Sequence, residues 1–363
     1  MSWETIVGHQ AALERFQKSA RRNRLASTYL FVGPSGIGKR TFAIKLAQSL
    51  LCSATPESEL DSCGHCPACQ QVLSGSHPDL IQVAKPPDKK FIPVETFIGD
   101  REHRRQRGMC HDIGLKPFYG GRKIAIIDDA DYLNAESANS LLKTLEEPPP
   151  KSILILIGSS QQRQLQTIIS RSQVVHFSPL TAEQVQHVLE CHQLIDTDTD
   201  PQPIAQAANG SVEQAIHLSA PELLEFVHLL YHQLASLDPS QEDFAKALGT
   251  FVDSAGKDAA LKRQRLSEVG DFAIYFYRDL LHRAADSNDV HESLEKHTSA
   301  ALSRFRQTGF SDSVVQEAAA ACIRRTLSMQ QEVHANAMQA NVITNWLADL
   351  GRLSRAESSF DLD

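Results

Sequence analysis

A glycine-rich loop after a short apolar run limits the folds open to this chain more than any other feature. The apolar run is Thr28–Val32, and the loop follows it directly. The pattern G-x-x-x-x-G-K lets backbone N–H groups cradle phosphate while the lysine supplies a cation. Its candidate phosphate-contacting residues are Gly33, Gly36, Gly38 and Lys39. The sequence therefore predicts a strand, a phosphate-binding loop and a helix over residues 40–51.

One position of this loop departs from the pattern. A Ser or Thr normally follows the lysine, because its hydroxyl coordinates the Mg²⁺ that bridges the β- and γ-phosphates. This chain has Arg40 there, and Thr41 comes one residue later. A shift of one residue turns a helical side chain by roughly 100°, so Thr41 does not replace the missing hydroxyl. We expect ATP and Mg²⁺ to bind weakly here, or without being hydrolysed.

Four further apolar runs indicate a parallel sheet. They are Leu80–Val83, Lys123–Ile127, Ile153–Ile157 and Gln173–Phe177. Continuous apolar runs that alternate with helical segments are typical of α/β proteins whose sheet is covered on both faces. The expected fold is an α/β P-loop NTPase domain with a parallel sheet.

The character of the sequence changes after Pro179, where the pattern becomes helical. Thr181 and Gln184 form a predicted capping box at the start of a helix. The predicted domains are 1–178 (P-loop domain), 179–219 (small helical lid), 220–350 (all-α domain) and 351–363 (flexible tail).

The composition excludes several classes of protein. The net charge of −8 argues against a protein that coats nucleic acid, although the run 101–107 is locally basic. That run is expected to be a solvated helix face, with a contact to DNA or to a partner as the alternative. No apolar run is long enough to span a bilayer, and the N-terminus lacks a signal-peptide pattern. We expect a cytoplasmic protein without a membrane partner.

Four cysteines have the spacing of a metal site, C-x10-C-x2-C-x2-C. They are Cys52, Cys63, Cys66 and Cys69. Four thiolates suit tetrahedral Zn²⁺, and a complete thiolate shell implies a structural role. An iron–sulfur cluster and buried free cysteines are the alternatives. The module 52–69 is expected to be an insertion held together by zinc, and the other three cysteines are expected to be buried thiols.

Two acidic residues follow the apolar run 123–127. Asp128 is placed to hold Mg²⁺, as in a Walker B motif. Asp129 stands where a glutamate usually polarises the attacking water, and aspartate is one methylene shorter. A misplacement of about 1 Å can cost on the order of 100-fold in rate. The alternative is that both acids only end a strand and cap the next helix.

Arg171 lies between Ser170 and Ser172 in a loop before the last apolar run. An arginine there could stabilise the charge on a transferring phosphoryl group bound to a neighbouring subunit. Considered alone, it is an ordinary surface charge.

Taken together, these elements resemble the bacterial clamp-loader family of AAA+ proteins. The resemblance rests on residues 25–34, the cysteine module, Asp128–Asp131, residues 138–149 (Ala-Asn-Ser-Leu-Leu-Lys-Thr-Leu-Glu-Glu-Pro-Pro) and Ser170–Ser172. It covers residues 3–220, and the helical remainder agrees in length and class. It implies an AAA+ domain, a three-helix lid and a collar domain in a five-subunit ring. Such a ring opens the sliding clamp and loads it onto primed DNA.

Within that family, the resemblance distinguishes two types of subunit. The gamma/tau motor type has a hydroxyl after Lys39, a glutamate at position 129 and an arginine at position 213, where this chain has Arg40, Asp129 and Glu213. The three departures favour the stator-like delta-prime type, with little intrinsic ATPase activity and with Arg171 offered in trans.

The resemblance implies gamma/tau and delta subunits, the sliding clamp and primer-template DNA as partners. The assembly would be a hetero-oligomer that belongs to the DNA polymerase III holoenzyme, which is a nucleotidyltransferase. The alternatives are an ATP-hydrolysing gamma/tau-type motor subunit and a DNA-repair helper of the same fold.

Overall fold

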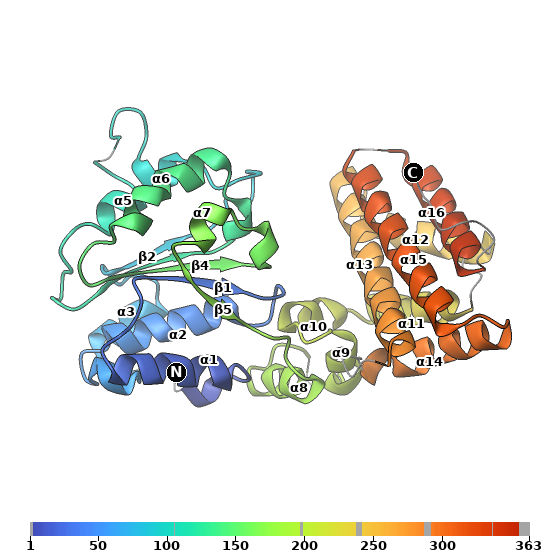
Figure 1. Cartoon of the computed structure of the whole chain (residues 1–363), viewed down its shortest axis with the longest axis horizontal. Helices are drawn as coiled ribbons and strands as arrows, with labels where there is room; N and C mark the ends of the chain where they lie inside the picture. Colours follow the sequence, from blue (N-terminus) through green and yellow to red (C-terminus); the bar gives the residue numbers. More distant parts are fainter. Residues whose placement is uncertain are drawn as a thin grey trace. The chain divides into compact units, whose positions relative to one another are not determined.

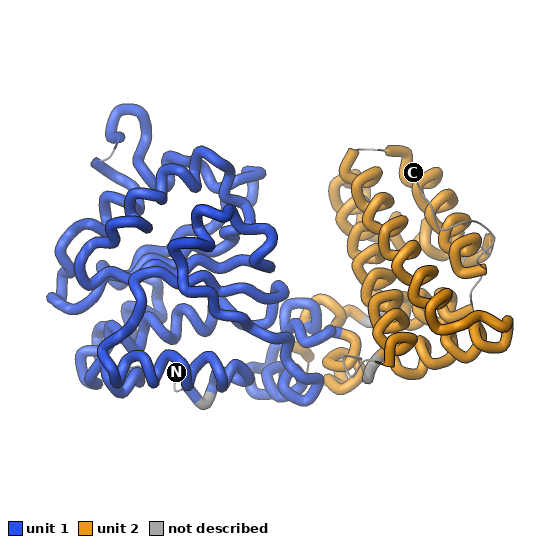
Figure 2. The backbone as a smooth tube through the Cα atoms, viewed as in Figure 1, with its two compact units in different colours: residues 1–194, 208–215 blue, residues 195–207, 216–363 orange. Residues whose placement is uncertain are grey.

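The computed structural model describes residues 3–104, 106–196, 199–236, 242–286, 292–335 and 337–355. The basic run 101–107 includes Arg105, and the predicted tail includes residues 356–363; these residues lie outside the described ranges. The described chain divides into two compact units (Figure 2). Unit 1 contains residues 1–194 and 208–215, and unit 2 contains residues 195–207 and 216–363. The predicted lid and collar boundaries stay a prediction.

A five-stranded parallel sheet forms the centre of unit 1, with the strand order β2-β3-β4-β1-β5 (Figure 1). The strands are β1 (Thr28–Val32), β2 (Leu80–Val83), β3 (Lys123–Ile127), β4 (Ser152–Gly158) and β5 (Gln173–His176). All five predicted apolar runs are therefore strands. Because they are parallel, the ends of β1, β3 and β4 meet at one edge of the sheet.

Helices cover both faces of this sheet (Figure 1). The main helices of unit 1 are α1 (Gln10–Arg21), α2 (Lys39–Leu51), α3 (Pro67–Leu73), α4 (Glu95–Ile98), α5 (Met109–Asp112), α6 (Ala135–Glu146), α7 (Gln166–Ile169) and α8 (Ala182–Cys191). Side chains alternate along β1: Tyr29 and Phe31 pack with α1 and α2, and Leu30 and Val32 pack with α6 and α7. The sheet is thus buried on both sides, as its continuous apolar strands predict.

Among its described residues, unit 2 contains helices and connecting segments but no strand. Its helices are α9 (Pro201–Ala207), α11 (Pro221–Ala235), α12 (Glu242–Asp253), α13 (Ala259–Ala284), α14 (Glu292–Gln307), α15 (Asp312–His334) and α16 (Gln339–Ser354). Helix α10 (Val212–Leu218) begins in unit 1 and ends in unit 2. The long helices α13 and α15 pack along each other, and α16 packs on α15. The predicted fold class, an α/β P-loop domain followed by helical regions, is confirmed.

Local sequence explains where helices begin. Thr181 caps α8 by accepting from the Gln184 amide, while the Gln184 side chain accepts from the Thr181 amide. This is the predicted capping box.

Among the described residues, no helix has both the length and the apolar character needed to cross a bilayer.

Candidate functional site: phosphate loop and cysteine cluster

The predicted phosphate loop lies between β1 and α2, at the edge of the sheet where the strands end. Gly36 and Gly38 have positive φ angles of 72° and 94°, which side-chain-bearing residues rarely adopt. A Cβ on Gly36 would also lie 2.1 Å from the Ser211 hydroxyl oxygen. Glycine is therefore required at position 36 both by the backbone conformation and by the close approach of another segment.

Lys39 begins α2 and is almost fully buried, with 7% of the residue exposed. Its ammonium donates to the carbonyl oxygens of Gly33 at 2.7 Å and of Pro34 at 2.5 Å. Burial lowers the pKa of Lys39, while the nearby Asp128 and Asp131 carboxylates act in the opposite direction. The lysine is thus folded back onto its own loop.

Arg40 and Asp128 form an ion pair at the end of the sheet. The Arg40 Nε lies 3.5 Å from Asp128 Oδ2, and the two side chains are 57% and 22% exposed. Burial raises the pKa of Asp128 and the neighbouring Asp129 raises it further, whereas Arg40 and Lys39 lower it. The structure therefore brings together the two residues that were predicted separately. The sequence could have indicated this pair, since a cationic residue occupies the motif position after the lysine and an acid occupies the Walker B position, and both positions contact Mg²⁺ in the motif.

The two acids after Asp128 contact different neighbours. Asp129 has a left-handed backbone, with φ of 57°, and its carboxylate accepts from the Lys85 amide at 3.4 Å. Asp131 accepts from the Ser159 amide at 2.8 Å and from the Gln164 side chain. Asp131 therefore connects the end of β3 to the end of β4 by hydrogen bonds, a role that its sequence position did not predict.

The start of α10 packs against the phosphate loop within unit 1. The Val212 amide donates to the Gly36 carbonyl oxygen at 2.9 Å, and the Ser35 hydroxyl donates to Glu213 Oε2 at 3.1 Å. Glu213 thus places a carboxylate beside the loop that would hold phosphate. Thr41 is exposed, and no described contact places it in the cradle.

Arg171 lies just after α7 with about a third of its side chain exposed. Its Nη2 is 2.7 Å from Glu146 Oε1, and its Nη1 donates to the Thr167 carbonyl oxygen at 3.0 Å. Arg171 lies in unit 1 with the phosphate loop, but no described contact joins it to that loop.

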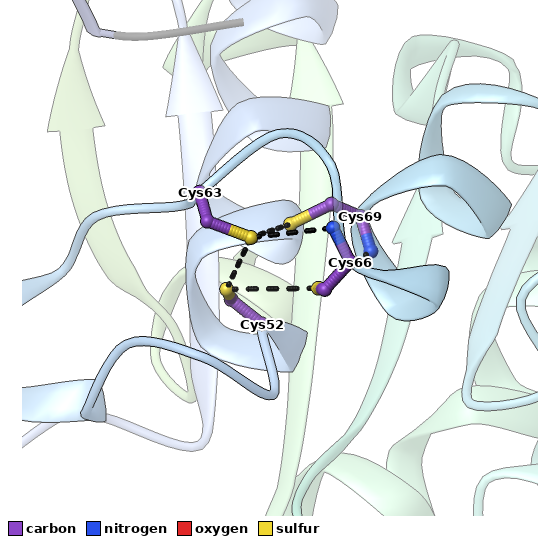
Figure 3. Close-up of side chains that lie close together, drawn as sticks. All are labelled: Cys52, Cys63, Cys66 and Cys69. Carbon is purple, nitrogen blue, oxygen red and sulfur yellow. Dashed lines mark hydrogen bonds between the residues drawn. The ribbon is translucent and has the colours of Figure 1, made fainter.

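The four predicted ligand cysteines form one cluster (Figure 3). Their sulfur atoms all lie within 4.8 Å of one another. The Cys66 amide points at Cys63 Sγ at 3.3 Å, and the Cys69 amide points at Cys66 Sγ at 3.4 Å. Although burial alone would raise it, hydrogen bonds from Ser53 and Cys69 lower the pKa of Cys66 to about 5. In contrast, burial and the neighbouring Cys66 and Cys52 sulfurs raise the pKa of Cys69. The convergence of four sulfur atoms fits a tetrahedral metal ion.

The remaining cysteines differ in exposure. Cys322 is buried, and burial raises the pKa of its thiol to about 12. Cys110 is half-buried, whereas Cys191 is exposed, so the prediction of a buried thiol is wrong for Cys191. Cys191 lies at the end of α8, where the helix turns it outward.

These features define an α/β P-loop domain that carries a four-cysteine cluster. A family model described as "DNA polymerase III, delta subunit" matches residues 8–181. Over this stretch, which is just under half of the chain, the sequence is similar to the clamp-loader subunits of DNA polymerase III.

Curated relatives include both types of subunit in this family. DNA polymerase III subunit delta' of Bacillus subtilis is 33% identical over 222 residues, which are 60% of this chain and 62% of that protein. The delta' subunit of Pseudomonas aeruginosa is 36% identical over 150 residues, 41% of this chain and 42% of that protein. Subunit tau of Escherichia coli is 32% identical over 223 residues, 59% of this chain and 32% of that protein. The matches span less than two thirds of these relatives.

Proposed function

We propose that this chain is a delta-prime-type subunit of the DNA polymerase III clamp loader. In this role it helps to load the sliding clamp onto primed DNA while hydrolysing little or no ATP itself. Its partners would be gamma/tau and delta subunits, the clamp and, through the complex, primer-template DNA, in a cytoplasmic hetero-oligomer. The delta' relatives and the family model support this assignment.

The observation that carries the proposal is the ion pair between Arg40 and Asp128, at 3.5 Å. In a working P-loop ATPase, the residue after the lysine and the Walker B acid both contact Mg²⁺. Here a guanidinium takes the place of the hydroxyl and neutralises the acid. A magnesium ion would have to displace a cation that is covalently part of the chain, so productive ATP–Mg²⁺ binding is disfavoured.

The first turn of α10 adds a second obstacle to nucleotide binding. Glu213 accepts a hydrogen bond from Ser35 and places negative charge beside the phosphate cradle. A carboxylate close to the cradle would repel anionic phosphate. Lys39, which would contact phosphate, instead donates to two loop carbonyls. Nucleotide that binds through Lys39 and the loop amides would be held weakly.

The cysteine cluster would hold one Zn²⁺ with a structural role. Four thiolates complete a tetrahedral shell and leave no position for substrate. The ligands come from the end of α2, from the following loop and from α3. Zinc bound there would fix α3 against α2, and no step of ATP hydrolysis would pass through it.

Arg171 would act on the ATP of an adjacent motor subunit. A guanidinium stabilises the negative charge that develops on a transferring phosphoryl group. Its partial exposure on this chain leaves it accessible to a neighbour. The chain would thus contribute to hydrolysis in the complex without a working site of its own.

ATP turnover measured on the purified chain and on a reconstituted clamp loader tests the proposal. We expect the isolated chain to show no turnover above background, and the complex to require the chain for full clamp- and DNA-stimulated hydrolysis. Robust turnover by the isolated chain that Lys39→Ala abolishes would instead identify a gamma/tau-type motor. The similarity to subunit tau and the presence of Lys39 are the observations that favour this second candidate, a gamma/tau-type motor.

A further inference from the structure

The last residue of α6 contacts the arginine that is proposed to act in trans. Glu146 Oε1 lies 2.7 Å from Arg171 Nη2. The other terminal nitrogen, Nη1, donates to the Thr167 carbonyl oxygen at 3.0 Å and to the Ser170 hydroxyl at 3.2 Å. Acceptors from two separate segments therefore hold one guanidinium.

The position of Glu146 is unfavourable for the helix itself. An acid in the last turn lies at the negative end of the helix macrodipole, which cationic side chains prefer. Pro148 favours the end of the helix here, because the helical conformation is disfavoured for a residue before proline. Glu147 accordingly has φ of −123° and ψ of 69°. The helix thus ends with the Glu146 side chain beside Arg171, whose charge offsets the macrodipole.

Both segments rest on the same core. Leu141 and Leu145 of α6 are 0% and 4% exposed, and Ile168 of α7 is 1% exposed in the same cluster. The Ser172 hydroxyl donates to the Ile168 carbonyl oxygen at 2.8 Å and closes the turn around Arg171. Close packing leaves little freedom for α6 and α7 to shift against each other, so the distance between Glu146 and Arg171 is defined by the core.

We propose that Glu146 is a positioning residue that holds the Arg171 guanidinium ready for the nucleotide of a neighbouring subunit. The proposal rests on the proposed function, in which Arg171 acts in trans. A guanidinium carries five N–H donors, and Arg171 keeps about a third of its side chain exposed. Donors not engaged by the chain's own acceptors are thus available to phosphate. An arginine that is already ordered loses less conformational freedom when the transition state forms.

Glu146→Gln tests this role, because glutamine keeps the size and helix preference of glutamate and removes its charge. We expect the reconstituted clamp loader with this variant to hydrolyse ATP with a kcat that is about 3- to 10-fold lower and an unchanged KM for ATP. Glu147→Gln, one residue further along, is the matched control and is expected to behave as wild type. Circular dichroism of each purified variant checks the fold.

A double-mutant cycle separates positioning from a general structural effect. We expect Glu146→Gln to have no further effect when Arg171→Ala is already present, since the group it positions is gone. An unchanged kcat for Glu146→Gln alone, or an equal loss in both backgrounds, would overturn the positioning role and leave the proposed function standing. If Arg171→Ala alone has no effect on the complex, the action of Arg171 in trans fails, and the inference fails with it.

Discussion

Single residues decide whether the phosphate loop is a catalytic site. Arg40 departs from the phosphate-loop pattern in the sequence, and its guanidinium lies beside Asp128, the predicted Walker B acid. Lys39 is the residue that the motif requires, yet it donates to its own loop. A motif match therefore defines the backbone of the loop, while the neighbouring side chains define what it can bind.

Arg40→Thr should restore part of the metal site. The substitution removes the cation beside Asp128 and supplies the hydroxyl that the motif lacks. We expect the affinity for a fluorescent ATP analogue in the presence of Mg²⁺ to rise roughly tenfold, the equivalent of one contact to a charged group at about 1.5 kcal/mol. Arg40→Lys, which keeps the cation, is the control, and equal affinities of the two variants would contradict this prediction.

Asp128→Asn should stabilise the protein at neutral pH. Burial raises the pKa of Asp128 above its unfolded value, so wild type begins to lose stability as the pH rises past the unfolded pKa, and the loss is complete above the raised pKa. The amide cannot ionise, and its gain should grow as the pH rises from about 4, the ordinary carboxyl pKa, through the raised value.

Thermal unfolding of Asp128→Asn and wild type at pH 4 and pH 7 measures this difference. The exposed Asp88→Asn is the control and should show no change. A gain for Asp128→Asn of equal size at both pH values would show that its cause is not ionisation.

At the scale of elements, the cysteine module shows how spacing in sequence becomes geometry. Each C-x2-C segment bends so that a backbone amide points at the preceding sulfur, and the four sulfurs converge. The ligands connect the end of α2 to α3, whereas the phosphate loop lies before the start of α2. We therefore expect the module to bear on folding rather than on chemistry.

Cys66→Ser should remove the metal and weaken unit 1. We expect elemental analysis to find about one zinc per chain in wild type, as in four-cysteine structural sites, and almost none in the variant. The midpoint of thermal unfolding should fall by about 5 °C or more, which is about 2 kcal/mol for a domain of this size.

Cys191→Ser is the matched control, because Cys191 is exposed and lies outside the cluster. It should keep its zinc and its unfolding midpoint. Iron in place of zinc, or a Cys66→Ser variant that keeps its metal, would contradict the proposed site.

At the scale of the whole molecule, the proposed role of Arg171 needs a second subunit, because the nucleotide on which it would act belongs to a neighbour. Arg171 lies on the sheet domain, while unit 2 is a separate all-helical body. The proposed activity therefore belongs to an assembly rather than to the chain alone.

Arg171→Ala should leave the isolated chain folded and slow ATP hydrolysis by the assembled clamp loader about tenfold or more, because an arginine finger supplies on the order of 10³–10⁵ at the site it serves. Steady-state ATPase assays with clamp and primed DNA measure this. Arg163→Ala changes another arginine, one whose guanidinium reaches Ser159, and should have no effect. Equal rates for the two variants would remove the trans role.

Much of the fold could be predicted because its signals are local. All five strands were predicted from apolar runs, and the capping box of α8 was predicted from Thr181 and Gln184. The side-chain partners could not be predicted in the same way. Ser35 and Glu213 are 178 positions apart, and periodicity says nothing about contacts at such a separation.

The sequence by itself determined the parallel sheet, the phosphate loop and the cysteine cluster, because period, glycine conformation and ligand spacing depend on neighbouring residues. Only the tertiary structure decided that Arg40 pairs with Asp128, that Glu213 lies against the loop and that Glu146 holds Arg171. Each of these contacts joins charged or polar groups from separate elements. Their distances follow from how the sheet, its helices and their shared core pack together, which no local stretch of sequence specifies.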